Sequence, residues 1–295
     1  MNRPNNTEGL AGAAYASPVV PSRHFRSSTT ATGDGDNLPS TRNAAVGQAG
    51  RALRRPWYAF WRWVERRWYD GHSYSLSIPY GYRVFTPWFS NDGNSEFTEM
   101  VRTARARGPL TKSADRCYML YQLSRSALRL SADWAECGVH TGGTAHLLSL
   151  ISNRYPRRFH LFDTFNGVPS TARHRRDYHV PGDFSDTSLD LVRRRLEHFP
   201  FVAFHPGEIP STFDRVANVR SYSFVHVDVD IYPAVRACCE WFWPRVCAGG
   251  IMLFNDYGIY PYRYASKAAV DSFFATVKDG SLIVLPTGQA VAFKY

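Results

Sequence analysis

The hydrophobic and polar positions of residues 113–295 alternate between two periods. Short runs of apolar and β-branched residues are separated by longer segments in which apolar residues recur at helical spacing. The short runs are 134–139, 159–162, 201–204, 224–229, 251–254, 282–285 and 290–293. The helical segments are 113–130 (with Ser113 as its cap), a stretch through 147–151, 188–198, 233–243 and 265–277. Strands and helices in this order predict an α/β fold with a doubly wound, mostly parallel sheet.

The last two strand-like runs differ from the others because only the turn residues 286–289 separate them. A connection this short joins antiparallel strands, so we expect a C-terminal antiparallel hairpin at one edge of the sheet. In parallel sheets, ligands bind beyond the carboxyl ends of the strands. The polar residues that directly follow each predicted strand are therefore the candidates for function.

The first 110 residues lack this alternation. Residues 1–50 are rich in Ser, Thr, Asn, Gly, Ala and Pro, and we expect a disordered tail. Residues 51–70 place aromatic residues at helical spacing and carry six arginines against two acidic residues. They predict a basic aromatic helix within an N-terminal extension, 51–110, that precedes the main domain at 111–295. This helix either packs on the domain or a partner subunit, or lies on an anionic membrane surface.

Composition and charge exclude several classes of protein. A hydrophobic content of 44% supports a packed core and excludes a wholly disordered or collagen-like chain. Five cysteines without C-x-x-C spacing favour a reducing cytoplasm over a disulfide framework or a zinc site. We recognise no membrane-spanning run and no secretory signal, so a cytoplasmic location is expected. Residues 51–70 contribute +4 to the formal net charge of +10, and the last 220 residues contribute only +5, so the charge of the whole chain does not imply a nucleic-acid partner.

The first predicted strand leads into a turn that contains Gly138 and Gly142. The missing Cβ atoms of such a turn let a ligand approach the backbone. The G-x-G-x-x-G pattern of dinucleotide-binding proteins is not present, which argues against an NAD-dependent dehydrogenase. Asp163 ends the second strand, where a carboxylate holds a ribose diol in nucleotide-binding α/β sheets. The alternative is that Asp163 caps the turn before Asn166.

Two sets of oxygen ligands follow the fourth and fifth predicted strands. Asp228 and Asp230 are two residues apart, and in an extended strand this spacing puts both side chains on one side of the chain. Such crowding of negative charge is unfavourable without a cation. Asn255 and Asp256 end the next strand, so we expect Asp228, Asn255 and Asp256 to converge on Mg²⁺. The alternative is that these residues only form turns.

Four motifs in order resemble the macrocin O-methyltransferase family, class I S-adenosylmethionine (SAM)-dependent sugar methyltransferases of antibiotic pathways. The motifs are ECGVHTGGT, LFDTFNGVPS, VDVDIY and CAGGIMLFNDYG, within about residues 110–275. The resemblance implies a Rossmann-like fold, SAM and Mg²⁺ as cofactors, and transfer of a methyl group to a hydroxyl of a sugar, a glycoside or another small natural product. This sequence departs from the family pattern at Val229, usually glycine, and at Asn255, usually aspartate.

The resemblance also implies roles for individual residues. The methionine end of SAM would contact Glu136, Gly138, Thr141, Gly142, Gly143 and Thr144. Asp163 would hold the ribose, and the turn that contains Gly207 would approach the adenine. Asp228, Asn255 and Asp256 would bind Mg²⁺, and Asp230 matches the general base that takes the proton from a sugar hydroxyl.

The loop at 170–186 is long and polar, which is typical of a lid over an acceptor pocket. Tyr178, Asp183, Tyr232 and the arginine-rich segment 173–176 are the candidates for shaping that pocket. His226 alternates away from Asp228 and is expected in the core. Two other classes of function stay open: a non-catalytic protein that binds SAM, and a membrane-surface or assembly protein, including a homo-oligomer, that acts through 51–70.

Overall fold

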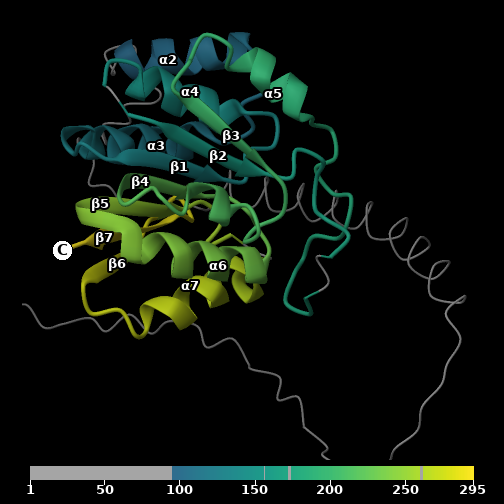
Figure 1. Cartoon of the computed structure of the whole chain (residues 1–295), viewed down its shortest axis with the longest axis vertical. Helices are drawn as coiled ribbons and strands as arrows, with labels where there is room; N and C mark the ends of the chain where they lie inside the picture. The colour runs from purple at the N-terminus through teal and green to yellow at the C-terminus, as the bar shows by residue number, and fades with distance from the viewer. Residues whose placement is uncertain (1–94, 156, 172–173, 260–261) are drawn as a thin grey trace, which may run out of the picture. The chain divides into compact units, whose positions relative to one another are not determined.

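The computed structural model describes residues 95–155, 157–171, 174–259 and 262–295 (Figure 1). The expected disordered tail and the expected basic aromatic helix lie outside these residues. None of the described helices is long and apolar enough to cross a membrane.

One seven-stranded sheet organises the described residues, in the order β3-β2-β1-β4-β5-β7-β6. The strands are β1 (Asp133–Cys137), β2 (Phe159–Asp163), β3 (Val202–Pro206), β4 (Tyr222–Val227), β5 (Val246–Phe254), β6 (Gly280–Val284) and β7 (Ala290–Lys294). Strands β1 to β5 are parallel, whereas β7 runs antiparallel to both β5 and β6. The predicted doubly wound sheet and the predicted C-terminal antiparallel hairpin are confirmed.

The strand order reverses between β1 and β4, which makes this pair the switch point of the sheet. The two strands are in register up to Cys137 opposite Val227. The segments that follow them therefore leave the same edge of the sheet side by side. Ligand sites of doubly wound sheets lie at this position.

Helices cover both faces of the sheet (Figure 1). They are α2 (Ser95–Ala106), α3 (Ala114–Ser126), α4 (Gly143–Ser152), α5 (Leu189–Arg195), α6 (Tyr232–Phe242) and α7 (Ser266–Phe274). Alternate residues of β1 face opposite sides of the sheet and belong to different hydrophobic clusters. The first core cluster contains Trp134 and residues of α2 to α5, and the second contains Ala135 and residues of α6 and α7. Burial on both faces explains why the parallel strands read as continuous apolar runs.

Helix α2 lies in the segment that the sequence assigned to the N-terminal extension. Its residues Phe97, Val101 and Ala104 are buried in the first core cluster, and the helix packs on α4. The packed unit therefore includes residues from Ser95 onward.

Among the α-helices in the described residues, two have a serine at the N-cap, but only one of these serines caps with its side chain. The hydroxyl of Ser188 accepts a hydrogen bond from the Leu191 backbone N–H at 3.2 Å. Ser113 stands at the N-cap of α3 as predicted, yet its side chain makes no capping bond there. Only its carbonyl takes part, accepting from the Cys117 N–H at 3.0 Å. The predicted cap position is therefore confirmed, although the serine hydroxyl accepts no capping hydrogen bond.

Candidate active site

The turn after β1 depends on glycine at two positions. Gly138 and Gly142 have φ angles of +86° and +80°, in the left-handed region that residues with a Cβ rarely adopt. A Cβ on Gly138 would lie 2.1 Å from the carbonyl oxygen of Asp228. The Asp228 N–H in turn donates to the Cys137 carbonyl at 2.8 Å. The glycine turn and the acidic segment after β4 are therefore in direct contact at the switch point.

The residues from Thr141 to Thr144 lead into helix α4 and are buried. Gly142 is the N-cap of α4, and Gly143 is its first residue. A Cβ on Gly143 would lie 2.6 Å from the carbonyl oxygen of Pro109, so this glycine also lets the 109–110 segment pack against the helix. Packing alone therefore already requires glycine in this turn.

Asp163 lies at the tip of β2 beside this turn, as the sequence predicted. Its Oδ2 accepts hydrogen bonds from the backbone N–H groups of Val139 and His140, at 2.6 and 2.9 Å. Its Oδ1 accepts from the N–H of Phe165 at 2.6 Å. The carboxylate thus holds the glycine turn in place, which is close to the turn role that the sequence left open. A ribose hydroxyl would have to share these oxygens.

The turn that contains Gly207 follows β3 and touches the same strand tip. The Gly207 N–H donates to the Asp163 carbonyl at 2.9 Å, and Gly207 has a φ angle of +138°. The tips of β1, β2 and β3 thus carry the residues predicted to contact SAM along one edge of the sheet.

Glu136 is fully buried within β1 and pairs with His226 of β4. The Glu136 Oε1 and His226 Nδ1 atoms are 2.8 Å apart. Burial raises the pKa of Glu136, and the hydrogen bond from His226 opposes that rise. The interpretation of His226 as a core residue is confirmed, since it is buried. Glu136 is thus a buried residue of β1, two positions before Gly138 of the glycine turn.

The acidic residues converge, although not for the reason that the sequence suggested. Strand β4 ends at Val227, so Asp228 and Asp230 lie beyond it, and Asp230 has a left-handed φ of +58°. The prediction that strand alternation aligns these two side chains is therefore wrong. A turn brings them together instead: ligand atoms of Asp228, Asp230 and Asp256 all lie within 4.8 Å of one another.

Asn255 lies between two of these carboxylates. Its Nδ2 donates to Asp228 Oδ1 at 2.6 Å and to Asp256 Oδ2 at 3.3 Å. Its Oδ1 accepts from Gln289 Nε2, at 3.3 Å, in the turn before β7. The three predicted metal ligands are thus brought together, with Asn255 presenting its amide nitrogen to the carboxylates.

Two cations that sequence reasoning missed neutralise this cluster. Lys112 Nζ is 2.8 Å from Asp228 Oδ2, and Arg116 Nη2 is 2.6 Å from Asp256 Oδ1. Burial alone would lower the pKa of Lys112, but Asp228 and the neighbouring carboxylates raise it above its usual value. Burial would likewise raise the pKa of Asp256, but the two cations hold it well below its usual range. The cations precede β1 and belong to no motif, so nothing in the sequence marked them.

Asp230 is the carboxyl group of the cluster that neither cation contacts directly. Burial, followed by the nearby charges of Asp256 and Asp228, raises its pKa well above the usual value. Its Oδ1 is buried without a hydrogen-bond partner among the described residues. Carboxylate and amide oxygens suit a hard cation such as Mg²⁺. The converging carboxylates of Asp228, Asp230 and Asp256, one with a buried unpaired oxygen, fit such an ion, whereas Asn255 presents its nitrogen and not its oxygen to them.

The loop between β2 and α5 approaches Asp230 through His179. His179 Nδ1 is 3.0 Å from Asp183 Oδ2, and His179 Nε2 is 2.9 Å from the Tyr262 hydroxyl. The same Nε2 is 3.9 Å from Asp230 Oδ2. Asp183 thus approaches Asp230 only through His179, and its role in an acceptor pocket stays a prediction. His179 and Tyr262 were missed because they stand in no motif.

A second set of loop contacts leads to Tyr232, the first residue of α6. Asp177 Oδ1 accepts from the Tyr232 N–H at 2.7 Å, and the His174 ring stacks on the Tyr232 ring at a centroid distance of 4.8 Å. Arg176 lies over the same ring, and Tyr178 packs edge-on against Tyr262. The structure thus places Tyr232 and Tyr178 in contact with the loop and with Tyr262, and their role in an acceptor pocket stays a prediction. Arg173 lies outside the described residues.

Comparison with known proteins agrees with this geometry. Residues 135–257 match a family model described as a methyltransferase domain. A curated relative, 8-demethyl-8-(2,3-dimethoxy-alpha-L-rhamnosyl)-tetracenomycin-C 4'-O-methyltransferase from Streptomyces olivaceus, is 26% identical over 140 residues. The match covers 43% of this chain and 53% of the relative, so the chain spans about half the length of that protein.

Two solved structures share the fold. The O-methyltransferase NovP has a TM-score of 0.58 and 19% identity, over 68% of this chain and 98% of NovP. CalS11, a calicheamicin methyltransferase, has a TM-score of 0.50 and 18% identity, over 74% of this chain and 99% of CalS11. At these identities the likeness concerns the fold alone. Residues 135–257 therefore match a methyltransferase domain, and the chain has the class I methyltransferase fold.

Proposed function

We propose that the protein is a SAM-dependent O-methyltransferase that transfers a methyl group to a hydroxyl of a sugar, a glycoside or another small natural product. The observation that carries the proposal is the contact between the glycine turn and the acidic segment at the switch point, where Gly138 packs against the Asp228 backbone. The site for the methyl donor SAM and the site for the acceptor would thus lie next to each other. The relative named for 4'-O-methylation of a rhamnosyl tetracenomycin supports a sugar acceptor.

SAM would bind along the tips of β1, β2 and β3. The turn from Gly138 to Thr144, with Glu136 behind it, would receive the methionine end, because glycine backbone and the amino end of α4 offer N–H groups to a carboxylate. Asp163 would contact the ribose while holding the turn, and Gly207 would approach the adenine. In its narrower form, the proposal assigns the protein to the macrocin O-methyltransferase family.

The acceptor would bind at the acidic cluster under the loop that carries His179. Asp228, Asp256 and the amide oxygen of Asn255 would hold Mg²⁺, once that amide turns from Gln289 toward the ion. A divalent cation at this position would lower the pKa of an acceptor hydroxyl.

Asp230 is the proposed general base. Its unpaired Oδ1 would accept the hydroxyl proton, and positive charge beside Asp228 and Asp256 would make ionisation of Asp230 less unfavourable. His179, which contacts Asp183, lies beside Asp230 and would border the bound acceptor. The protein's remaining task is to align the acceptor oxygen with the methyl group of SAM.

The test is methyl transfer by the purified full-length protein. We would offer methyl-labelled SAM, Mg²⁺ and a panel of deoxysugar nucleotides and rhamnosylated aglycones, and follow both S-adenosylhomocysteine (SAH) and the mass of the acceptor. We expect equal amounts of SAH and of an acceptor heavier by one methyl group. SAM binding without turnover on any hydroxyl acceptor would instead support a non-catalytic SAM-binding protein.

The proposal leaves a separate role for residues 51–70, outside the described part of the chain. Their basic and aromatic composition supports contact with an anionic membrane surface or a second subunit. Co-sedimentation with vesicles and the oligomeric state of a variant that lacks residues 1–75 test the two alternatives.

A further inference from the structure

Lys112 reaches the acidic cluster from a distant part of the chain. It lies just before α3, whereas Asp228 follows β4. The ammonium nitrogen is 2.8 Å from Asp228 Oδ2 and 3.1 Å from Oδ1, so it bridges both oxygens of one carboxylate. Asp228 is the residue that the proposed function assigns to the metal. The ammonium group therefore occupies the oxygens that a divalent cation would use.

Arg116 is held differently from Lys112. Its guanidinium contacts the side chain of Asp256 and donates to the backbone carbonyl of Asn255, and its side chain is 13% exposed. The Lys112 ammonium bonds to Asp228 and to no other residue in the described part of the chain, and its side chain is 22% exposed. Arg116 is thus fixed by two partners, whereas Lys112 can leave by giving up one carboxylate.

A divalent cation and this ammonium cannot both use Asp228 in the observed arrangement. Mg²⁺ binds oxygen at about 2.0–2.1 Å, which would put two positive charges a few ångströms apart at a partly buried site. Like charges at that distance repel strongly where water is scarce. Without either cation, Asp228 would face Asp230 and Asp256 with no compensating charge of its own.

We propose that Lys112 is a displaceable counter-cation that competes with the divalent metal for Asp228. This inference rests on the proposed function, in which Asp228, Asn255 and Asp256 hold the metal. Lys112 stabilises the metal-free cluster and weakens metal binding, because the ammonium must leave Asp228 before the metal enters. Arg116 stays on Asp256 in both states and keeps that side of the site in place.

The test is calorimetric titration of metal-stripped, full-length protein with Mg²⁺, without SAM or acceptor. Lys112→Met removes the charge and keeps an unbranched chain. Lys294→Met is the matched control, because Lys294 is also partly buried, at 13% exposure, and pairs with Asp279 away from the cluster. We expect Lys112→Met to bind Mg²⁺ at least about tenfold more tightly than the wild type, and Lys294→Met to match the wild type.

Lys112→Gln also removes the charge and serves as a second variant, should Lys112→Met fold poorly. It too is expected to bind Mg²⁺ more tightly than the wild type. Lys112→Arg keeps the charge and is expected to bind Mg²⁺ no more tightly than the wild type. Equal affinity of the wild type, Lys112→Met and Lys112→Gln would overturn the inference, and so would the absence of Mg²⁺ binding in all of them. Methyl transfer is measured separately, so tighter Mg²⁺ binding by Lys112→Met without turnover in the wild type would contradict the proposed function alone.

Discussion

Replacement of Arg195 by methionine tests how the glycine turn is held in place. Arg195 ends α5 and is 5% exposed. Its Nη1 donates to the carbonyls of Pro109 and Thr141, at 2.8 and 3.0 Å, and its Nη2 donates to those of Ala104 and Gly108, both at 2.9 Å. One guanidinium thus joins the end of α2, the segment after it and the glycine turn.

The size of the effect follows from these four bonds. A hydrogen bond from a charged donor contributes about 1.5–3 kcal/mol, but bonds that share one side chain do not add. Burial also lowers the pKa of Arg195, which reflects the cost of removing the ion from water, and its Nε is buried without a partner among the described residues. Because Arg195→Met takes the donor away from four carbonyl oxygens at a buried site, we expect it to lower the free energy of unfolding by about 3–5 kcal/mol.

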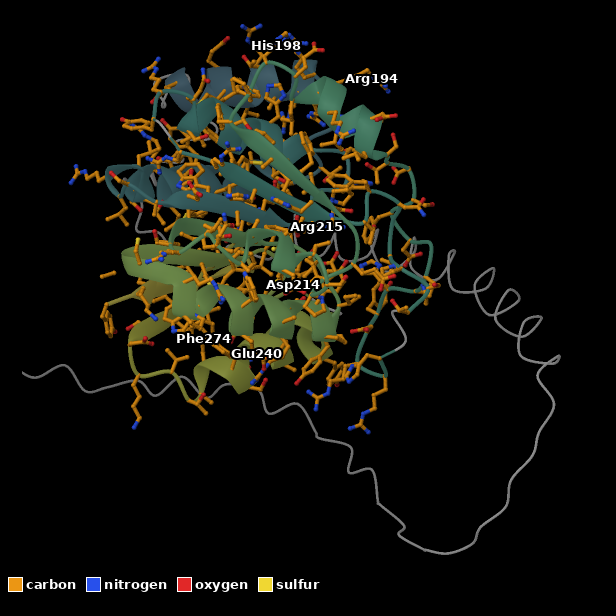
Figure 2. The ribbon with its side chains drawn as sticks, in the orientation of Figure 1. Arg194, His198, Asp214, Arg215, Glu240 and Phe274 are labelled. Carbon is orange, nitrogen blue, oxygen red and sulfur yellow. The ribbon has the colours of Figure 1, made fainter. Side chains whose placement is uncertain are left out.

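The assay compares the free energy of unfolding in urea of Arg195→Met with that of the wild type and of a control variant, Arg194→Met. Arg194 is exposed near the carboxyl end of the same helix and is labelled in Figure 2. The control should lie within about 0.5 kcal/mol of the wild type. A loss of less than about 1 kcal/mol in Arg195→Met would refute the reasoning that this residue anchors the turn.

Four further predictions concern the site and the core. Asp163→Ala removes the acceptor that holds the glycine turn, so SAH affinity in calorimetry should fall by about 1–3 kcal/mol; unchanged affinity would contradict this. EDTA should abolish methyl transfer and Mg²⁺ should restore it, except in Asp256→Ala; full activity of metal-free protein would exclude the metal. Asp230→Asn should slow transfer by about 10²–10⁴-fold with unchanged Mg²⁺ affinity, and recovery of the rate at high Mg²⁺ would make Asp230 a ligand instead. Burial lowers the pKa of His146 to about 4, so stability should fall by up to about 3 kcal/mol as the pH drops from 6.5 toward 4, and His146→Phe should reduce that slope in urea unfolding.

The fold was predictable because its strands are buried on both faces. The run at 159–162 is apolar except for His160, the run at 251–254 is apolar throughout, and each corresponds to a strand in the sheet. The tips of neighbouring strands then bring Asp228 and Asp256 together whatever the details of the loops. The order of the strands therefore predicted which residues meet at the site, whereas strand alternation did not predict how Asp230 reaches it. Asp230 has a left-handed φ angle in the turn after β4.

The contacts that the sequence did not predict are those between distant segments. Lys112 pairs with a residue more than a hundred positions later, and no period or motif links the two. Arg195 is the last of three consecutive arginines, and only packing distinguishes it, since Arg193 and Arg194 are exposed. Local pattern sets which face of an element is apolar, but it does not say which polar side chain will meet a given carbonyl or carboxylate.

The central claim is that the edge of the sheet at the β1–β4 switch point binds SAM for methyl transfer. The most direct measurement is calorimetric titration of the full-length protein with SAH, the product that every SAM-dependent transfer leaves behind. The account predicts one SAH per chain, displaced by SAM, with weaker binding in Asp163→Ala. A folded wild-type protein that binds neither SAH nor SAM would contradict the account.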